Sequence, residues 1–304
     1  MRLETPKRGI ELITSDLTEK AISFISQCKT CMKLNNIAPC FIGNMDETAI
    51  WYDMPGATTV AVKGTNSVPL LTTGHEKQHI TVCLAAMANG CRLKPLIVFK
   101  GKRFPNELKG ITEAIVKLSS NGWMNEELTL QWMEDPVEDA VLESNSVSVI
   151  VPGGCTKILQ PADVSWNAPF KSTYRLHYDS WLAWDDRSVT PACRAPPKVL
   201  MVQWVVASWK SISAEVIRRS FAACGITTSN PDAIHCLRDS GVASDAYTAI
   251  HQLHHTDVST VRVTEEEDQH DVDSDGAFDD LVTVTLKLIK LRFGGSPIPF
   301  EKFV

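Results

Sequence analysis

The stretch CFIGNMD (40 to 46) is an apolar run that ends in an acidic residue. This pattern predicts a buried strand whose last residue, Asp46, reaches a hydrated end of a sheet. Three later runs have a similar strand pattern: TTVAVKG (58 to 64), HITVCLAAM (79 to 87) and RLKPLIVFK (92 to 100). Asn89-Gly90, a strong hairpin signal, separates the last two. The first third of the chain therefore predicts three or four strands in a meander.

The rest of the chain is predicted to mix helices and strands. SVSVIV (146 to 151) is a short β-branched run followed by Pro and Gly, as expected for a buried strand. QPAD (160 to 163) opens a long helix and puts Asp163 in its first turn, where negative charge is favourable. The remaining predicted elements are helices over 122–143, 199–209 and 214–224, the last with Ser213 as N-cap and Gly225 as stop, and a strand without a named partner over 282–293.

Length and composition are those of an ordinary globular protein, with 304 residues, 44% hydrophobic and 22% charged. No apolar run is long enough to cross a bilayer and the first twenty residues have no secretory signal, so we predict an intracellular protein without a membrane partner. The net charge of −6 hides an asymmetry, because residues 264–280 carry nine acids and no base, and the remainder is +3. This asymmetry suits a protein that binds a polyanion, and equally a solvated surface with a disordered tail.

Two short motifs have both a chemical and a plain interpretation. Cys28 and Cys31 have the C-x-x-C spacing of metal and redox sites, but no second pair of ligands follows, which favours buried thiols. DVDSDG (271 to 276) begins like a calcium loop, but Val282 stands where the loop needs Glu, which favours an acidic linker.

Asp46 and Asp163 form the pair with the most chemical content. Two carboxylates brought to one spot repel each other unless a divalent cation lies between them. Considered without their surroundings, the two residues are compatible with a metal site and with two unrelated surface acids.

Four long strings decide between these alternatives: NMDETAIWYDMPG (44 to 56), GTNSVPLLTTGHEKQHITVCLAAMANGCRLKPLIVFKGK (64 to 102), NGWMNEELTLQWM (121 to 133) and VPGGCTKILQPADVSWNAPFK (151 to 171). In this order they closely resemble the pogo/Tigger branch of DDE-superfamily transposases, which is related to centromere protein B and jerky. The likeness runs over roughly residues 40 to 225.

The resemblance implies an α/β fold of the RNase H-like kind, a mixed sheet flanked by helices, which cuts DNA with Mg²⁺ or Mn²⁺ held by three carboxylates. By motif match, Asp46 is similar to the first family carboxylate and Asp163 to the third, so these two are the expected catalytic and metal-binding residues. DNA is the expected partner and the nucleus the expected location, and a homo-oligomer is left open. The implied organisation is an N-terminal helical segment (1–39), an incomplete core (40–184), C-terminal core helices (185–226) and an acidic, mostly disordered tail (227–304).

The sequence departs from the family at the second carboxylate. No apolar strand ending in Asp lies between Met133 and Val147, so we interpret one central strand as deleted. Asp135 and Asp139 lie in polar, helix-like surroundings and are, with Asp53, only weak candidates for the missing ligand. Two carboxylates hold one cation weakly, and placing a second metal within ~4 Å needs a further ligand, so DNA cleavage is predicted to be impaired.

The lost strand also leaves a structural question. Without it, the backbone groups of the 40–46 strand need another partner. We predict that SVSVIV (146 to 151) pairs directly with the 40–46 strand, with the 124–143 helix as the crossover.

Nucleic-acid contact is predicted for a basic hairpin and loop that carries Lys94, Lys100, Lys102, Arg103 and Lys109. About 45 residues precede Asp46 and they resemble core helices, so sequence-specific binding is not expected from this chain. Three functions are weighed: an impaired, transposon-derived endonuclease-like protein, a domesticated non-catalytic module that binds DNA or protein, and an active nuclease with an unrecognised carboxylate.

Overall fold

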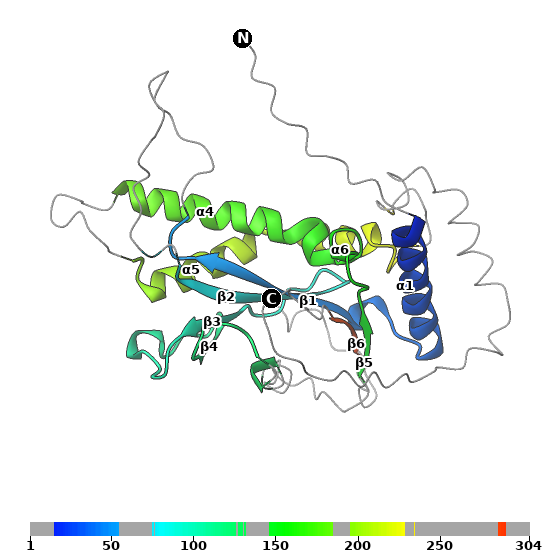
Figure 1. Cartoon of the computed structure of the whole chain (residues 1–304), viewed down its shortest axis with the longest axis horizontal. Helices are drawn as coiled ribbons and strands as arrows, with labels where there is room; N and C mark the ends of the chain where they lie inside the picture. Colours follow the sequence, from blue (N-terminus) through cyan, green and yellow to red (C-terminus); the bar gives the residue numbers. More distant parts are fainter. Residues whose placement is uncertain are drawn as a thin grey trace, which may run out of the picture.

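The protein has a mixed α/β structure in which helices pack against a six-stranded sheet (Figure 1). The structure is a computed structural model that describes residues 15–54, 75, 77–125, 127–129, 131, 146–184, 195–228, 234 and 285–289. The strands are β1 (Ile42–Trp51), β2 (His79–Met87), β3 (Leu96–Lys100), β4 (Ile115–Ser119), β5 (Ser146–Ile150) and β6 (Thr285–Ile289). The helices are α1 (Ser15–Leu34), α3 (Thr156–Leu159), α4 (Asn167–Trp184), α5 (Lys198–Ser211) and α6 (Ala214–Ala223), with short helical turns η1 (Pro39–Phe41), η2 (Asn106–Leu108) and η3 (Ala162–Trp166). None of these described helices is both long and apolar enough to span a bilayer.

The strands are ordered β4-β3-β2-β1-β6-β5 across the sheet. β1, β2 and β3 form an antiparallel meander as predicted, and β2 has the bounds that the sequence indicated. β1 continues to Trp51 and Asp46 is buried within it, so the prediction that this strand ends at Asp46 at a hydrated end of the sheet is wrong. β4, which pairs parallel to β3, was not predicted, because it is a short and only half-buried strand without clear alternation. The predicted strand over 58–64 lies outside the described residues.

β6 lies between β1 and β5 and is antiparallel to both, with Leu288 opposite Ile42 on one side and Val147 on the other. The prediction that the 146–151 strand pairs directly with the 40–46 strand is therefore wrong. β5 runs parallel to β1 as predicted. The strand between them is β6, which belongs to the segment 282–293 that was predicted as a strand without a partner. Alternation reports that a segment fits a sheet, and it does not report which strands it joins.

The two faces of the sheet bury different cores. On β1, Asp46, Thr48 and Ile50 point to one face and the intervening residues to the other. The first face packs against η3, α4, α5 and α6 and forms the main core, whose largest buried side chains include Trp166, Phe170, Tyr174 and Phe221. The opposite face has a smaller core of Cys83, Leu96, Val98 and Leu128.

The predicted helices that follow β5 are confirmed with local adjustments, and most of the predicted helix over 122–143 lies outside the described residues. The helix opened by QPAD begins as a π-helical turn, η3, and continues as α4 alongside the sheet (Figure 1). Ser213 caps α6, because its Oγ accepts a hydrogen bond from the Val216 N–H at 3.2 Å. Gly225 ends the helix with φ of +76°, a conformation that favours glycine.

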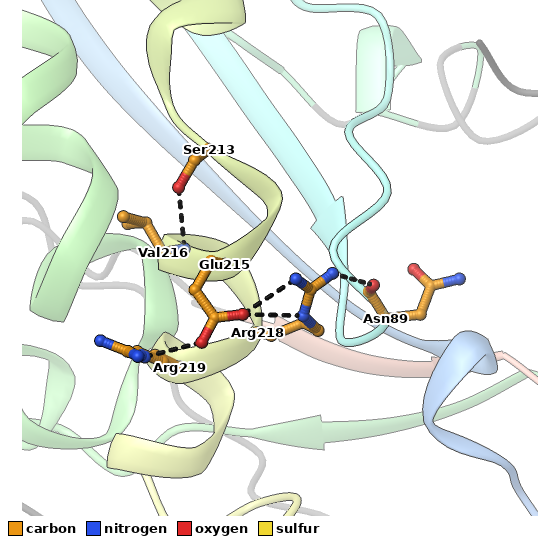
Figure 2. Close-up of polar contacts among 6 residues, drawn as sticks. All are labelled: Asn89, Ser213, Glu215, Val216, Arg218 and Arg219. Atoms are coloured by element: carbon orange, nitrogen blue, oxygen red, sulfur yellow. Dashed lines mark hydrogen bonds and ion pairs between the residues drawn. The ribbon is translucent and has the colours of Figure 1, made fainter.

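The hairpin turn at Asn89-Gly90 docks on the start of α6. Arg218 donates to the Asn89 carbonyl at 3.3 Å while Glu215 holds the same guanidinium at 2.9 Å (Figure 2). Gly90 has φ of +95°, and a Cβ placed on it would lie only 2.8 Å from the Ala214 carbonyl oxygen. The close approach fixes the meander against the helical layer.

Gly90→Ala is expected to destabilise the protein by about 2–4 kcal/mol, since it combines a left-handed backbone conformation with a clash against backbone. Gly110→Ala is the matched control, because Gly110 has φ of +84° but open space around it, and should lose only about 1–2 kcal/mol. Urea unfolding followed by circular dichroism measures both variants. Equal losses would contradict the inference that hairpin docking contributes.

Candidate functional site

The carboxylates of Asp46 and Asp163 meet at the side chain of Asn167. Asp46 lies on the main-core face of β1, and Asp163 lies in η3, at the start of the long helix. The Asn167 Nδ2 donates a hydrogen bond to Asp46 Oδ2 and, at 3.0 Å, a second one to Asp163 Oδ1. One amide nitrogen thus lies between two carboxylates that come from distant parts of the sequence.

Backbone geometry positions these side chains. Asn44, on the same face of β1 as Asp46, accepts a hydrogen bond from the Ala162 N–H at 3.1 Å and so ties the strand to η3. The Asn167 N–H closes the π-helical turn on the Ala162 carbonyl. Isolated π turns inside helices are frequent at functional sites. Here the turn places Asp163 and Asn167, four residues apart, on the side that faces β1.

The two carboxylates have different surroundings. Asp46 is 8% exposed, whereas Asp163 is exposed. Burial raises the pKa of Asp46 above its usual range, and the nearby Asp163 carboxylate raises it further. The amides of Asn167 and Gln160 and the backbone of Glu47 oppose this pKa shift. The site therefore favours a species that carries positive charge, either a proton or a cation.

Amide oxygens beside the carboxylates have no hydrogen-bond partner. Gln160 is completely buried, yet neither its Oε1 nor its Nε2 makes a well-formed hydrogen bond within the described residues, and the same holds for Asn167 Oδ1. Buried polar atoms without partners are costly and need an explanation. Carboxylate and amide oxygens are the ligands that Mg²⁺ and Mn²⁺ prefer, so this donor set fits such a cation.

A third acidic ligand is not found in the described part of the chain, where no three Asp, Glu, His or Cys side chains group closely enough to hold a metal. Asp53 is buried elsewhere, where its carboxylate accepts hydrogen bonds from the His75 N–H at 2.8 Å and the Tyr178 hydroxyl at 3.0 Å. It joins a loop to α4, as expected for a loop or cap residue. Asp135 and Asp139 lie outside the described residues.

The predicted DNA-contacting residues are all on the surface. Lys94 lies between β2 and β3, Lys100 ends β3, and the other three lie on or next to the η2 loop. Each of the five is exposed: Lys94, Lys100, Lys102, Arg103 and Lys109. Exposure leaves all five side chains accessible to phosphate groups.

Three polar residues of the site were missed at the level of sequence. Asn44 stands two residues before Asp46, a spacing that puts both on one face of a strand. Asn167 stands four residues after Asp163, the spacing of neighbours on a helix surface. These two spacings were the available signals, whereas nothing in the pattern marks Gln160.

Residues 135–221 form the segment that matches the family described as DDE superfamily endonuclease. It contains Asp163, Gln160 and Asn167, while Asp46 lies before it. Two curated relatives are each named "Pogo transposable element with KRAB domain". The Mus musculus protein is 28% identical over 254 residues, which cover 72% of this chain and 41% of the relative. The Homo sapiens protein is 29% identical over 250 residues, which cover 71% of this chain and 40% of the relative. The chain resembles pogo-like, DDE transposase-derived proteins and spans about two fifths of the length of these relatives. No solved structure matches it.

Proposed function

We propose that the chain is a DNA-binding, transposon-derived endonuclease-like protein with an RNase H-like core, acting in the nucleus, in which DNA cleavage is impaired. One observation carries the proposal: Asp46 and Asp163 converge on Asn167 without a third acid among the described residues. The DDE-superfamily match and the pogo-like relatives support the reaction class.

In this proposal Asp46 and Asp163 bind one divalent cation, Mg²⁺ or Mn²⁺. When bound, such a cation would neutralise charge on a phosphodiester and polarise the attacking oxygen. Asp46, buried on β1, fixes the inner side of the site, and the exposed Asp163 forms its open side. Asn167 and Gln160 orient the carboxylates and offer neutral oxygen atoms.

Impairment follows from the number of charged ligands. Two-metal cleavage places the cations on both sides of the scissile phosphate, which needs an additional carboxylate to hold the second ion. Amide oxygens are neutral and offset less of the repulsion between two cations than a carboxylate does. A single weakly held cation is the expected state.

A second candidate function, a domesticated module that binds DNA without chemistry, is favoured by the hydrogen bonds of Asn167. Because its amide nitrogen already bridges both carboxylates, the site is tied together without any metal. Both candidates include DNA binding and differ in whether a cation enters the site.

Supercoiled plasmid incubated with the purified protein and Mg²⁺ or Mn²⁺ is expected to remain uncut, and Asp46→Asn should behave in the same way. Mn²⁺ titrated into the protein and followed by thermal melting should raise Tm only slightly, and Asp46→Asn should remove this effect. Nicking that Asp46→Asn abolishes would overturn the claim of impairment. A Tm shift that Asp46→Asn leaves unchanged would exclude the proposed cation site.

DNA binding has its own test in gel shifts at several salt concentrations. Charge reversal of Lys100, Lys102 and Arg103 together is expected to weaken duplex binding about tenfold or more and to reduce the salt dependence, by roughly 0.9 in slope for each lost phosphate contact. Lys33→Glu, an exposed change on α1, is the control for net charge. If the single charge reversals Lys100→Glu and Lys33→Glu weakened duplex binding equally, this result would contradict a localised DNA-binding surface.

A further inference from the structure

Two exposed tryptophans flank a histidine on the face of the sheet opposite Asp46. Trp51, the last residue of β1, is 42% exposed, and Trp123, in the turn after β4, is 44% exposed. His79 is directly opposite Trp51 in the sheet, and its ring centroid lies 5.3 Å from that of Trp51 and 3.9 Å from that of Trp123. Trp51 follows Asp46 by five positions on one strand, so their side chains point to opposite faces. Trp51, His79 and Trp123 form what we call the aromatic shelf, which is separate from the carboxylate pair.

Hydrogen bonds hold one end of the aromatic shelf in a fixed orientation. The Thr81 hydroxyl donates to the Gly122 carbonyl at 2.8 Å, and the Gly122 N–H donates to Ser119 Oγ at 2.8 Å. The Trp123 N–H in turn donates to Asn121 Oδ1 at 3.0 Å. Gly122 has φ of +87°, which glycine adopts without strain. The exposed indole is thus presented by an ordered turn, and little freedom is lost when a ligand packs on it.

Positive charge borders the aromatic shelf. A Cβ on Gly122 would lie 3.3 Å from Lys100 Cβ and 3.6 Å from His79 Nε2, so Lys100 adjoins the shelf. Lys102 and Arg103 follow Lys100 in the sequence and are also exposed. Burial, and then the charge of Lys100, lower the pKa of His79 below its ordinary value, which keeps the ring neutral at pH 7. The buried His79 Nε2 has no hydrogen-bond partner among the described residues.

We infer that the aromatic shelf binds unpaired bases of a single nucleic-acid strand, with Lys100, Lys102 and Arg103 on the adjoining phosphates. Exposed indoles stack on any base, and cations beside them bind the backbone, which together is the usual design of sites for single-stranded nucleic acid. An apolar protein partner would use the tryptophans but gains little from the three cations. The inference rests on the proposed DNA binding and names an unpaired strand as its substrate.

The test compares a twelve-nucleotide oligo-dT with an abasic strand of the same length, which keeps the phosphates and lacks the bases. Fluorescence anisotropy at two salt concentrations measures both affinities, and a duplex is measured in parallel. Trp51→Ala and Trp123→Ala are each expected to weaken oligo-dT binding roughly 5- to 150-fold and to leave abasic binding unchanged. Leu176→Ala, which removes a 64% exposed apolar side chain on α4, should change neither.

Equal affinity of the native protein for oligo-dT and the abasic strand would overturn the aromatic shelf, while duplex binding would still support the proposed function. The aromatic shelf would also be overturned if both alanine variants bound oligo-dT as well as the native protein does, or if they lost equal affinity for oligo-dT and for the abasic strand. Absence of binding to all three probes would overturn both proposals. If an alanine variant melts at a lower temperature than the Leu176→Ala protein, Trp123→Leu takes its place, because it keeps an apolar side chain beside His79. Its affinities for oligo-dT and for the abasic strand are then compared in the same way.

Discussion

Removal of residues 281–304 is expected to destabilise the protein by about 4–8 kcal/mol, a large share of the stability of an ordinary domain. The deletion takes away β6, which pairs with β1 at three positions and with β5 at five. Both neighbours would then expose a row of unpaired N–H and C=O groups in the middle of the sheet. Urea unfolding followed by circular dichroism should show a lower midpoint, and size-exclusion chromatography should show association of the truncated chain.

A point substitution separates the strand from the rest of the removed segment. Leu286 is opposite Asn44 on one side and Val149 on the other, so Leu286→Pro interrupts both ladders and should lose about 3 kcal/mol or more. Leu286→Ile keeps the strand and should change stability by less than about 1.5 kcal/mol. Deletion of residues 290–304 alone is the control for length. Native stability in the Leu286→Pro protein would show that β6 is not a partner of β1 and β5.

Asn167→Leu is expected to lose about 2–4 kcal/mol at pH 7.5, because a buried carboxylate loses its amide donor and remains beside a second carboxylate. Leu branches at the same carbon as Asn but is larger, and the packing cost of the added volume does not depend on pH. The pKa of Asp46 is already raised by burial and by Asp163, and loss of the Asn167 hydrogen bond should raise it further. The folded state then binds more protons than the unfolded state above the unfolded pKa of ~3.9, so stability falls as pH rises from there through the raised folded pKa.

The deficit of Asn167→Leu should accordingly be smaller at pH 4.5 than at pH 7.5, as measured by urea unfolding at both values. Asp46→Asn gives the matched background, because an amide at this position remains an acceptor for Asn167 and carries no charge. In that background Asn167→Leu should lose about 1 kcal/mol or less, and the double-mutant cycle isolates the coupling. A deficit that is independent of pH and of the residue at position 46 would show that Asn167 acts only through packing.

The sequence predicted the local elements better than their neighbours in the sheet. Apolar runs and the Asn89-Gly90 signal indicated β1, β2 and β3, and Pro161 with Asp163 indicated the start of the long helix, because these features act within a few residues. The position of β6 could not be predicted in this way. Its pattern fits any sheet that offers open edges, and the choice of β1 and β5 depends on which edges the remainder of the chain leaves unpaired.

The candidate site was predictable in its charged residues and not in its neutral ones. Asp46 and Asp163 are expensive to place side by side, so their convergence carries chemical meaning and the family motifs mark both. Asn44, Gln160 and Asn167 are neutral, and in a sequence they are indistinguishable from residues that cap turns or lie at a surface. Only the fold shows that Asn167 bridges the two carboxylates and that Asn44 joins β1 to η3.

The place of β6 has a consequence for biosynthesis. Ile42 emerges from the ribosome long before its partner Leu288, so β1 gains its second neighbour only after almost all the intervening chain has been made. Contacts this distant in sequence form slowly, and an open strand edge invites association with other nascent polypeptides in the meantime. Occupancy by chaperones during translation is therefore expected to persist until the segment around residue 289 has left the exit tunnel.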